Sequence, residues 1–171
     1  FLFASDADWV VVNIMEGSRI DLFKPELVFL DLEVGDRCDL FRQLGSALAS
    51  LGYIEDTWYE AIVGREQDFP TGLQFEAVAV ALPHVDPVHL KKPYIAVVRP
   101  RTPVVFEGMA GIGGDVSAEL IVNLGLTGHA EGQVAVLQAL MNVFLDAAAV
   151  ADIMAQTTPE GVSAAMRRYC G

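Results

Sequence analysis

Residues 70–84, PTGLQFEAVAVALPH, predict a buried strand that ends at a histidine. The run Glu76–Leu82 is rich in small and β-branched residues, which is typical of a strand inside a sheet. Pro83 has no N–H to give a β-ladder and fixes its own φ near about −65°, so we expect the chain to leave the sheet there. The sequence therefore predicts that His84 lies at the rim of the sheet.

A histidine in such a place can be a nucleophile, a general base or a metal ligand. The ordinary histidine pKa of about 6.5 leaves the ring mostly neutral at pH 7. A neutral ring can attack through Nε2 when a backbone carbonyl or a carboxylate holds Nδ1–H. The alternative is a structural histidine with satisfied hydrogen bonds.

One strand and two helices are expected just before this stretch. Glu26–Val34 alternates as a strand does, and Asp36 is a candidate N-cap for the helix that follows it, with Gly52 at the end. The face of that helix carries leucine and phenylalanine at helical spacing: Leu40, Phe41, Leu44, Leu48 and Leu51. Asp56 is the candidate cap of the second helix. Its stripe is Trp58, Ala61, Ile62 and Arg65.

The elements after His84 complete an α/β pattern. Pro87 is expected to open one helical turn in the loop 85–93, and Tyr94–Val98 and Val104–Glu107 are expected to form an antiparallel pair because their connection is short. Ser117–Leu126 predicts another strand. A long helix is expected from Gly128-His129, with a break at Asp146, and Thr158 is the candidate cap of a last helix. The apolar stripe of the long helix is Val134, Leu137, Met141, Phe144 and Ala148. The predicted fold is a single α/β domain, a mixed β-sheet flanked by helices.

Composition excludes several classes of protein. The chain has 171 residues, 53% of them hydrophobic, which is enough for one sizeable core. Its formal net charge of −12 argues against a nucleic-acid backbone or an anionic membrane surface as partner. No apolar run approaches the roughly 20 residues of a membrane helix. Cys38 and Cys170 do not predict a disulfide framework, so a reducing cytoplasm is the expected location.

Several motifs together carry a family resemblance: Asp56-Thr57-Trp58, Arg65-Glu66, Phe69-Pro70-Thr71-Gly72 and Pro83-His84. With them the chain resembles the enzyme IIA phosphocarriers of the bacterial phosphoenolpyruvate-dependent sugar phosphotransferase system (PTS), in the fructose/mannitol superfamily, and looks most like the galactitol branch. The resemblance covers roughly residues 26–168. It implies an EIIA type-2 domain at 26–171. Residues 1–25 are expected to be an N-terminal arm, in which the β-rich run Trp9–Met15 predicts a short strand.

The resemblance implies a phosphotransferase component with a phosphohistidine intermediate. His84 would take a phosphoryl group from the carrier protein HPr and pass it to a cysteine of enzyme IIB, for uptake of galactitol or a related polyol. No cofactor and no metal is implied. Arg65 would assist the transfer, and either His129 or His89 would be a supporting histidine. Thr71 can donate its hydroxyl to a phosphate oxygen.

Other readings of the same residues stay open. Arg65 can extend to water along the helix, while His129 can simply begin a helix and His89 can lie at the surface. The pairs Glu55/Asp56 and Glu66/Asp68 resemble helix caps and solvated faces. Two other functions compete: a regulatory IIA-like module, and a metal-dependent hydrolase built on His84, Asp86 and His89.

Overall fold

A five-stranded mixed sheet forms the centre of the protein in a computed structural model that describes residues 21–111, 113–127 and 130–171. The strand order is β1-β4-β7-β3-β2. Pairs β1/β4 and β3/β7 are parallel, whereas β4/β7 and β2/β3 are antiparallel. The bounds are Phe23–Leu32 (β1), Gly72–Gln74 (β2), Ala79–Ala81 (β3), Tyr94–Pro100 (β4) and Leu120–Gly125 (β7). The predicted α/β class and mixed sheet are confirmed.

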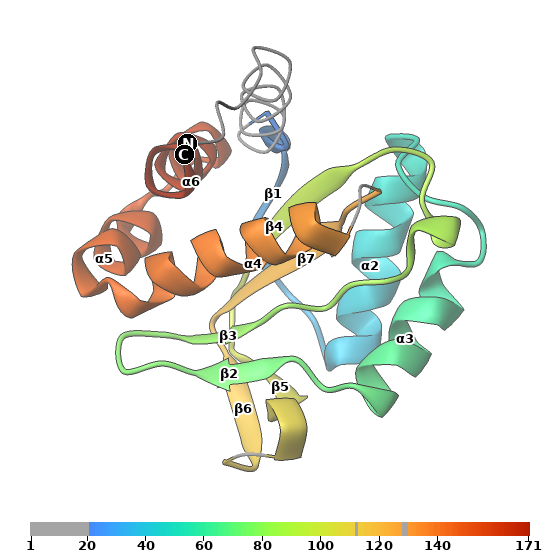
Figure 1. Cartoon of the computed structure of the whole chain (residues 1–171), viewed down its shortest axis with the longest axis horizontal. Coiled ribbons are helices and arrows are strands. Elements are labelled where there is room, and N and C mark those ends of the chain that lie inside the picture. The colour runs from blue at the N-terminus through green and yellow to red at the C-terminus, as the bar shows by residue number, and fades with distance from the viewer. Residues whose placement is uncertain (1–20, 112, 128–129) are drawn as a thin grey trace, which may run out of the picture.

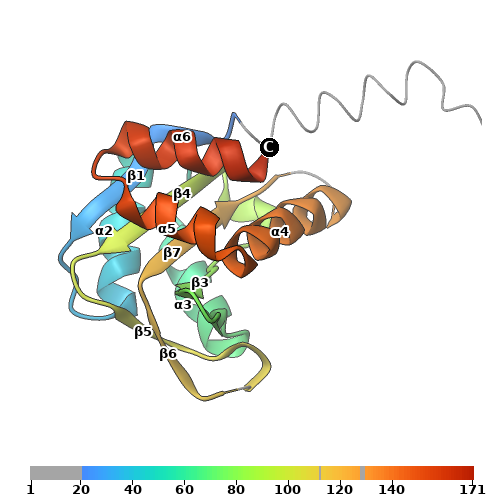
Figure 2. The same ribbon diagram turned by 90° about the vertical axis from the view of Figure 1, so that its left-hand side faces the viewer.

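Helices cover both faces of this sheet, which gives three layers (Figures 1 and 2). One face carries α2 and α3, and the other carries α4, α5 and α6. The bounds are Arg37–Ser50 (α2), Trp58–Asp68 (α3), Ala130–Leu145 (α4), Ala147–Ala155 (α5) and Pro159–Cys170 (α6). Alternate residues of β4 serve the two cores: Ile95 and Val97 pack with α4 to α6, and Ala96 and Val98 with α2 and α3.

The sequence locates both ends of α2 correctly. The Asp36 side chain accepts a hydrogen bond from the backbone N–H of Asp39 at 2.8 Å, as an N-cap does. Gly52, just past the helix, has a φ of +81°, a conformation that glycine adopts without strain. Four residues of the predicted face are buried: Leu40, Phe41, Leu44 and Leu48. Leu51 lies beyond the helix and is 38% exposed.

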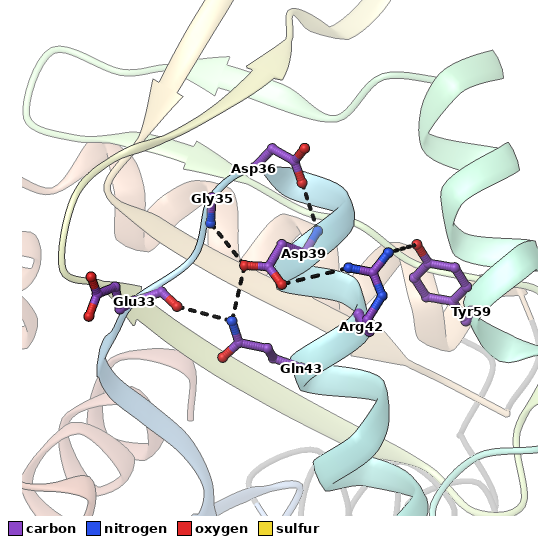
Figure 3. Close-up of polar contacts among 7 residues, drawn as sticks. All are labelled: Glu33, Gly35, Asp36, Asp39, Arg42, Gln43 and Tyr59. Carbon is purple, nitrogen blue, oxygen red and sulfur yellow. Dashed lines mark hydrogen bonds and ion pairs between the residues drawn. The ribbon is translucent and has the colours of Figure 1, made fainter.

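A polar network fastens the first turns of α2 to its surroundings (Figure 3). The Asp39 carboxylate accepts hydrogen bonds from the N–H of Gly35 at 2.9 Å and from the amide of Gln43 at 3.2 Å. Arg42 donates to the hydroxyl of Tyr59 on α3 at 3.2 Å. The contact between Arg42 and Tyr59 joins the two helices that lie on one face of the sheet.

The start of α3 differs from the prediction. Thr57, not Asp56, is at the N-cap position, and its side chain makes no capping hydrogen bond. Its hydroxyl is instead paired with Nδ1 of His89 at 2.7 Å, a partner 32 positions away that sequence spacing cannot identify. Trp58 and Ile62 are fully buried, as the predicted stripe requires.

The strand expected over Glu76–Leu82 is shorter and belongs to a hairpin. Only Ala79–Ala81 forms β3, and β2 pairs with it in the antiparallel sense. The N–H of Phe75 donates to the carbonyl of Val78 at 2.9 Å and closes the turn between the strands. Gly72 is required in β2 because a Cβ there would lie 2.6 Å from the carbonyl oxygen of Glu107.

The predicted antiparallel pairing of Tyr94–Val98 with Val104–Glu107 is wrong. Strand β5, Val104–Glu107, pairs instead with β6, Asp115–Ala118, in a separate two-stranded sheet. Both edges of β4 are already occupied by β1 and β7, so β5 has no place beside it. The strand expected over Ser117–Leu126 is accordingly divided at Glu119 between the two sheets.

The C-terminal helices begin where their caps predict. Asp146 accepts from the N–H groups of Ala148 and Ala149 and caps α5, and Thr158 accepts from Gly161 and caps α6. The predicted stripe of α4 is partly wrong, since Val134 is 60% exposed. From Gln133 to Leu145, the part of α4 whose side chains are described, the buried positions are Val136, Leu140, Val143 and Phe144. The predicted helix start at 128–129 and the strand Trp9–Met15 lie outside the described residues.

Within the described part of the chain, no single helix is both long and apolar enough to cross a membrane. The segments Gln133–Leu145 and Ala147–Ala155 meet those criteria only when taken together, across a bend of 91°. Both contribute buried residues to the core on their face of the sheet.

Candidate functional site

Strand β3 brings His84 to the edge of the sheet where β3 and β7 both end. Leu82 and Pro83 continue from β3 and are buried, whereas His84 is half-buried. A parallel backbone bridge joins His84 to Leu124, and the N–H of Leu124 donates to the carbonyl of Pro83 at 3.1 Å. The predicted position of His84 at the rim is what the structure has.

The imidazole of His84 has a defined hydrogen-bond partner. Nδ1 lies 2.9 Å from the carbonyl oxygen of Leu82. A carbonyl oxygen can only accept, so Nδ1 carries a proton, and in the neutral ring Nε2 is then the nitrogen with a free electron pair. The predicted acceptor for Nδ1–H of His84 is therefore the backbone carbonyl of Leu82.

A small cavity of about 30 Å³ adjoins His84. Leu124 at the end of β7 and Gln133 on α4 contribute to its wall. The remaining lining is apolar: Val85, Leu126 and Leu137. Most of the wall beside the ring is therefore apolar.

Thr71 supports the backbone before His84 from within the core. Its hydroxyl donates to the Glu66 carboxylate, with oxygen distances of 2.9 and 3.0 Å, and accepts from the N–H of Leu82 at 3.2 Å. Thr71 is only 3% exposed. In this arrangement the hydroxyl is engaged with Glu66, so the predicted contact with a phosphate oxygen would need it to turn, and that contact stays a prediction.

Glu66 departs from its expected place on a solvated face. It is 1% exposed, although Asp68 two residues later is exposed. Burial raises the pKa of the Glu66 carboxyl, while the hydrogen bonds from Thr71 oppose that shift. Its position explains this, because Glu66 follows Ile62 by one helical turn and extends the buried stripe of α3.

The guanidinium of Arg65 is paired with Asp86. Its Nη1 donates to Oδ1 of Asp86 at 3.0 Å, and its guanidinium lies 5.5 Å from the ring centre of Phe69. Nε of Arg65 is buried and has no hydrogen-bond partner among the described residues. A buried guanidinium N–H without an acceptor is costly, and an anion would satisfy it.

Arg65 and His84 line two separate cavities that share Val85. The cavity beside Arg65 has a volume of about 240 Å³, and Asp86 and His89 also line it. His89 belongs to the predicted helical turn Pro87–His89. The structure thus brings Arg65, Asp86 and His89 together around one cavity. Val85, the residue after His84, lines both this cavity and the one beside His84.

Of the two candidates for a supporting histidine, the structure describes only His89. His89 is half-buried, and its Nδ1 is paired with the hydroxyl of Thr57 at 2.7 Å. His129 lies outside the described residues, so the choice between the two stays open.

The three-ligand metal site hypothesised for His84, Asp86 and His89 is not formed. No group of three histidine, cysteine or acidic side chains that could hold a metal ion exists among the residues that the structure describes. Each hypothesised ligand has another partner: Leu82 for His84, Arg65 for Asp86 and Thr57 for His89.

Sequence reasoning missed the buried hydrogen-bond chain behind the site. Trp58 donates to the hydroxyl of Tyr94, Tyr94 donates to Asn123, and Asn123 donates to the carbonyl of Pro83. A single asparagine within the apolar run of β7 was the available signal, since a buried amide needs partners.

The comparisons with known proteins agree on one family. Residues 21–169 match the family model for "Phosphoenolpyruvate-dependent sugar phosphotransferase system, EIIA 2". The galactitol-specific EIIA component of the PTS in Escherichia coli strain K12 is 35% identical over 89 residues. That match covers 52% of this chain and 59% of the length of the relative.

Solved structures share the fold. The nitrogen regulatory protein IIA-Ntr of Neisseria meningitidis has a TM-score of 0.66 and 26% identity, over 86% of this chain and 97% of that one. The IIA mannitol chain of Escherichia coli, in complex with phosphorylated enzyme IIB mannitol, has a TM-score of 0.64 and 21% identity, over 82% of this chain and 94% of that one.

Proposed function

From the premise that the chain belongs to the EIIA 2 family of the phosphoenolpyruvate-dependent sugar phosphotransferase system, we propose that it is a phosphocarrier that is phosphorylated on His84. Its donor is HPr and its acceptor is a cysteine of an enzyme IIB. The cytoplasmic location expected from the sequence is part of this proposal. The division into an arm at 1–25 and a domain at 26–171 stays a prediction.

The contact between Nδ1 of His84 and the carbonyl of Leu82 carries the proposal. With Nδ1 protonated, the electron pair on Nε2 attacks the phosphorus of the donor phosphohistidine. A new N–P bond forms as the donor's N–P bond breaks, and the donor imidazole keeps the electron pair of the broken bond. The ring of His84 then carries a positive charge, which the Leu82 carbonyl stabilises through Nδ1–H. The second transfer runs the same way, with a thiolate sulfur as the attacking atom.

Arg65 supplies positive charge for the transferring group. Phosphoryl transfer depends on positioning and on cationic contacts to the phosphoryl oxygens. The Arg65–Asp86 pair is partly exposed, with 34% and 69% of the side chains accessible, so it contributes only roughly 0.2–1 kcal/mol and a phosphoryl group can displace it. Nε of Arg65 then gains an acceptor. His89 or His129 supports the phosphate, and Thr71 contributes through Leu82 or, if its hydroxyl turns, directly.

The transported sugar is proposed to be galactitol or a related polyol. Support comes from the relative named as galactitol-specific, over 52% of the chain. The named complex of a IIA with phosphorylated IIB mannitol supports the type of acceptor. A second candidate, a regulatory module controlled by phosphorylation, is favoured by the likeness to a nitrogen regulatory protein at 26% identity. Loss of growth on the polyol after deletion of the gene would favour transport, and unimpaired growth would favour regulation.

Incubation with phosphoenolpyruvate, enzyme I and HPr, followed by intact-mass measurement, tests the proposal. The wild-type chain should gain one acid-labile phosphate, and His84→Ala should gain none because the attacking nitrogen is gone. His89→Ala keeps the attacking nitrogen of His84 and should still gain one phosphate, more slowly if His89 is the supporting histidine. Equal labelling of His84→Ala and wild type would assign the nucleophile elsewhere.

Arg65→Ala in the same assay tests the cationic contact. The loss of a charge-assisted hydrogen bond, about 1.5–3 kcal/mol, predicts transfer roughly 10- to 150-fold slower, with an unchanged melting temperature. Arg42→Ala is the control, because Arg42 is an exposed arginine paired with Asp39 and Tyr59 on α2 and α3 (Figure 3). Equal rates for the two variants would contradict a role of Arg65 in transfer.

A further inference from the structure

Three fully buried polar side chains form one hydrogen-bonded chain that ends on the peptide unit before His84. The indole N–H of Trp58 donates to the hydroxyl oxygen of Tyr94 at 3.0 Å, and that hydroxyl donates to Oδ1 of Asn123 at 2.6 Å. Nδ2 of Asn123 donates to the carbonyl of Pro83 at 2.9 Å. Each of the three side chains is 0% exposed. The chain crosses from α3 through β4 and β7 to the end of β3.

The direction of every hydrogen bond in this chain is determined. The Pro83 carbonyl can only accept, so the NH₂ group of Asn123 must face it and Oδ1 must face Tyr94. The indole of Trp58 can only donate, so the hydroxyl of Tyr94 accepts from it and gives its own proton to Asn123. Burial raises the pKa of Tyr94, which keeps that hydroxyl protonated at neutral pH. Only one arrangement of donors and acceptors satisfies all the groups.

Packing prevents the chain from shifting. Gly125 lies opposite Tyr94 in the β4–β7 pair, and a Cβ at Gly125 would overlap the Tyr94 ring. A buried network with every member satisfied adds little stability compared with an apolar core, but it specifies one geometry. Here the geometry specified is that of the Pro83 carbonyl, which also accepts from the N–H of Leu124.

That peptide unit lies between the imidazole of His84 and the carbonyl that holds it. Pro83 lies between His84 and Leu82, whose carbonyl holds Nδ1 at 2.9 Å. A rotation of the Pro83 unit would change the distance between that carbonyl and the ring, and with it the preference for a proton on Nδ1. The N–H of Leu82 is anchored independently by Thr71. The segment is therefore held by side chains from two directions.

We propose that Asn123, oriented by Tyr94 and Trp58, is a positioning residue that keeps the proton of His84 on Nδ1 and leaves Nε2 free to accept the phosphoryl group. The effect of Asn123 on phosphoryl transfer rests on the proposed function of His84. The effect on the tautomer does not.

The test measures the ¹⁵N chemical shifts of the His84 ring by NMR in the unphosphorylated protein, together with the rate of phosphoryl loading from HPr. Wild type should have a protonated Nδ1 and an unprotonated Nε2. Asn123→Leu removes the amide at nearly constant volume and should shift both signals toward a mixture of tautomers. Loading should slow by about 2- to 12-fold, the factor expected for one lost hydrogen bond.

Tyr94→Phe is the second variant, and it keeps the test open if Asn123→Leu does not fold. It removes only the hydroxyl that orients Asn123, so the same changes should appear with smaller amplitude. Ser163→Ala is the matched control. Ser163 is 2% exposed and donates to the carbonyl of Phe23 at 3.1 Å, a buried side chain-to-backbone bond on α6, away from His84. It should lower stability and leave the ring signals unchanged.

Wild-type ring shifts and loading rates in both variants would overturn the proposal, even if their melting temperatures fall as in Ser163→Ala. Changed ring shifts in a protein whose wild type takes no phosphate from HPr would leave the positioning role standing and refute the proposed function. The two failures are therefore distinguishable.

Discussion

The carboxyl group of Glu66 lies in the core beside the site that it supports. It accepts from both the N–H and the hydroxyl of Thr71, at distances between 2.8 and 3.0 Å. Thr71 in turn holds the N–H of Leu82. A buried side chain on α3 thus helps to fix the backbone that precedes His84.

Because burial raises the pKa of Glu66, its ionisation should weaken the fold. A folded-state pKa above the unfolded value adds stability below the unfolded pKa, and this stability is lost as the pH rises through the folded pKa. Glu66→Gln removes the ionisation and keeps an acceptor for Thr71. The stability of Glu66→Gln relative to wild type should therefore increase from about pH 4 to pH 8. Urea unfolding at several pH values measures this difference.

Asp68→Asn is the control for that experiment, since Asp68 is an exposed acid on the same helix. Its stability difference from wild type should show no comparable rise. A constant difference for Glu66→Gln across this pH range would mean that the Glu66 carboxyl ionises as easily in the folded chain as in the unfolded one.

The α4–α5 junction shows how one residue ends an element and begins the next. The N–H of Asp146 donates to the carbonyl of Val143, and its side chain accepts from Ala148 and Ala149 at 3.0 and 3.2 Å. The cap satisfies N–H groups that would otherwise have no partner at the start of α5. The two helices can therefore turn by 91° while both remain packed on the sheet.

Asp146→Ala should destabilise the protein by about 0.5–2 kcal/mol, the usual cost of a lost N-cap. At this chain length, that loss lowers the melting temperature by roughly 1–8 °C. Thermal unfolding followed by circular dichroism measures it. Asp146→Ser restores a capping oxygen and should recover most of the loss. A variant with alanine that melts at the wild-type temperature would show that packing alone specifies the junction.

At the scale of the whole molecule, charge decides how partners approach. The formal net charge is −12, with 23 acidic residues against 11 basic ones. Such a charge attracts a basic partner over distances comparable to the Debye length, about 10 Å at 0.1 M salt. Association of this kind is accelerated mainly at the encounter step.

For a donor with a basic surface, the rate of the proposed phosphoryl loading from HPr should fall several-fold as salt rises from about 0.05 to 0.5 M, because screening removes the long-range attraction. Stopped-flow or quenched single-turnover measurements at low protein concentration follow this rate. A melting temperature taken at each salt concentration separates screening from unfolding. A rate that is constant or rises with salt would exclude electrostatic steering.

Local signals in the sequence predicted the α/β class, the starts of three helices and the position of His84 at the rim of the sheet. Caps at Asp36, Asp146 and Thr158 were predictable because an N-cap is satisfied within three residues. Pro83 placed His84 at the end of a strand because proline cannot continue a ladder. The family resemblance, carried by a few short motifs, is confirmed by the match over residues 21–169.

Only the tertiary structure decided which groups meet. The partners of β5, the engagement of Thr57 with His89 and of Arg65 with Asp86, and the burial of Glu66 all depend on segments distant in the sequence. Spacing along the chain says which face a residue occupies, but not what lies opposite that face. The proton on Nδ1 of His84 is a local contact, yet the backbone that makes it is held in place by Asn123, 41 positions past Leu82, through the Pro83 carbonyl. Hydrogen bonds and packing act across space, so the position of the His84 ring is fixed only once the chain has folded.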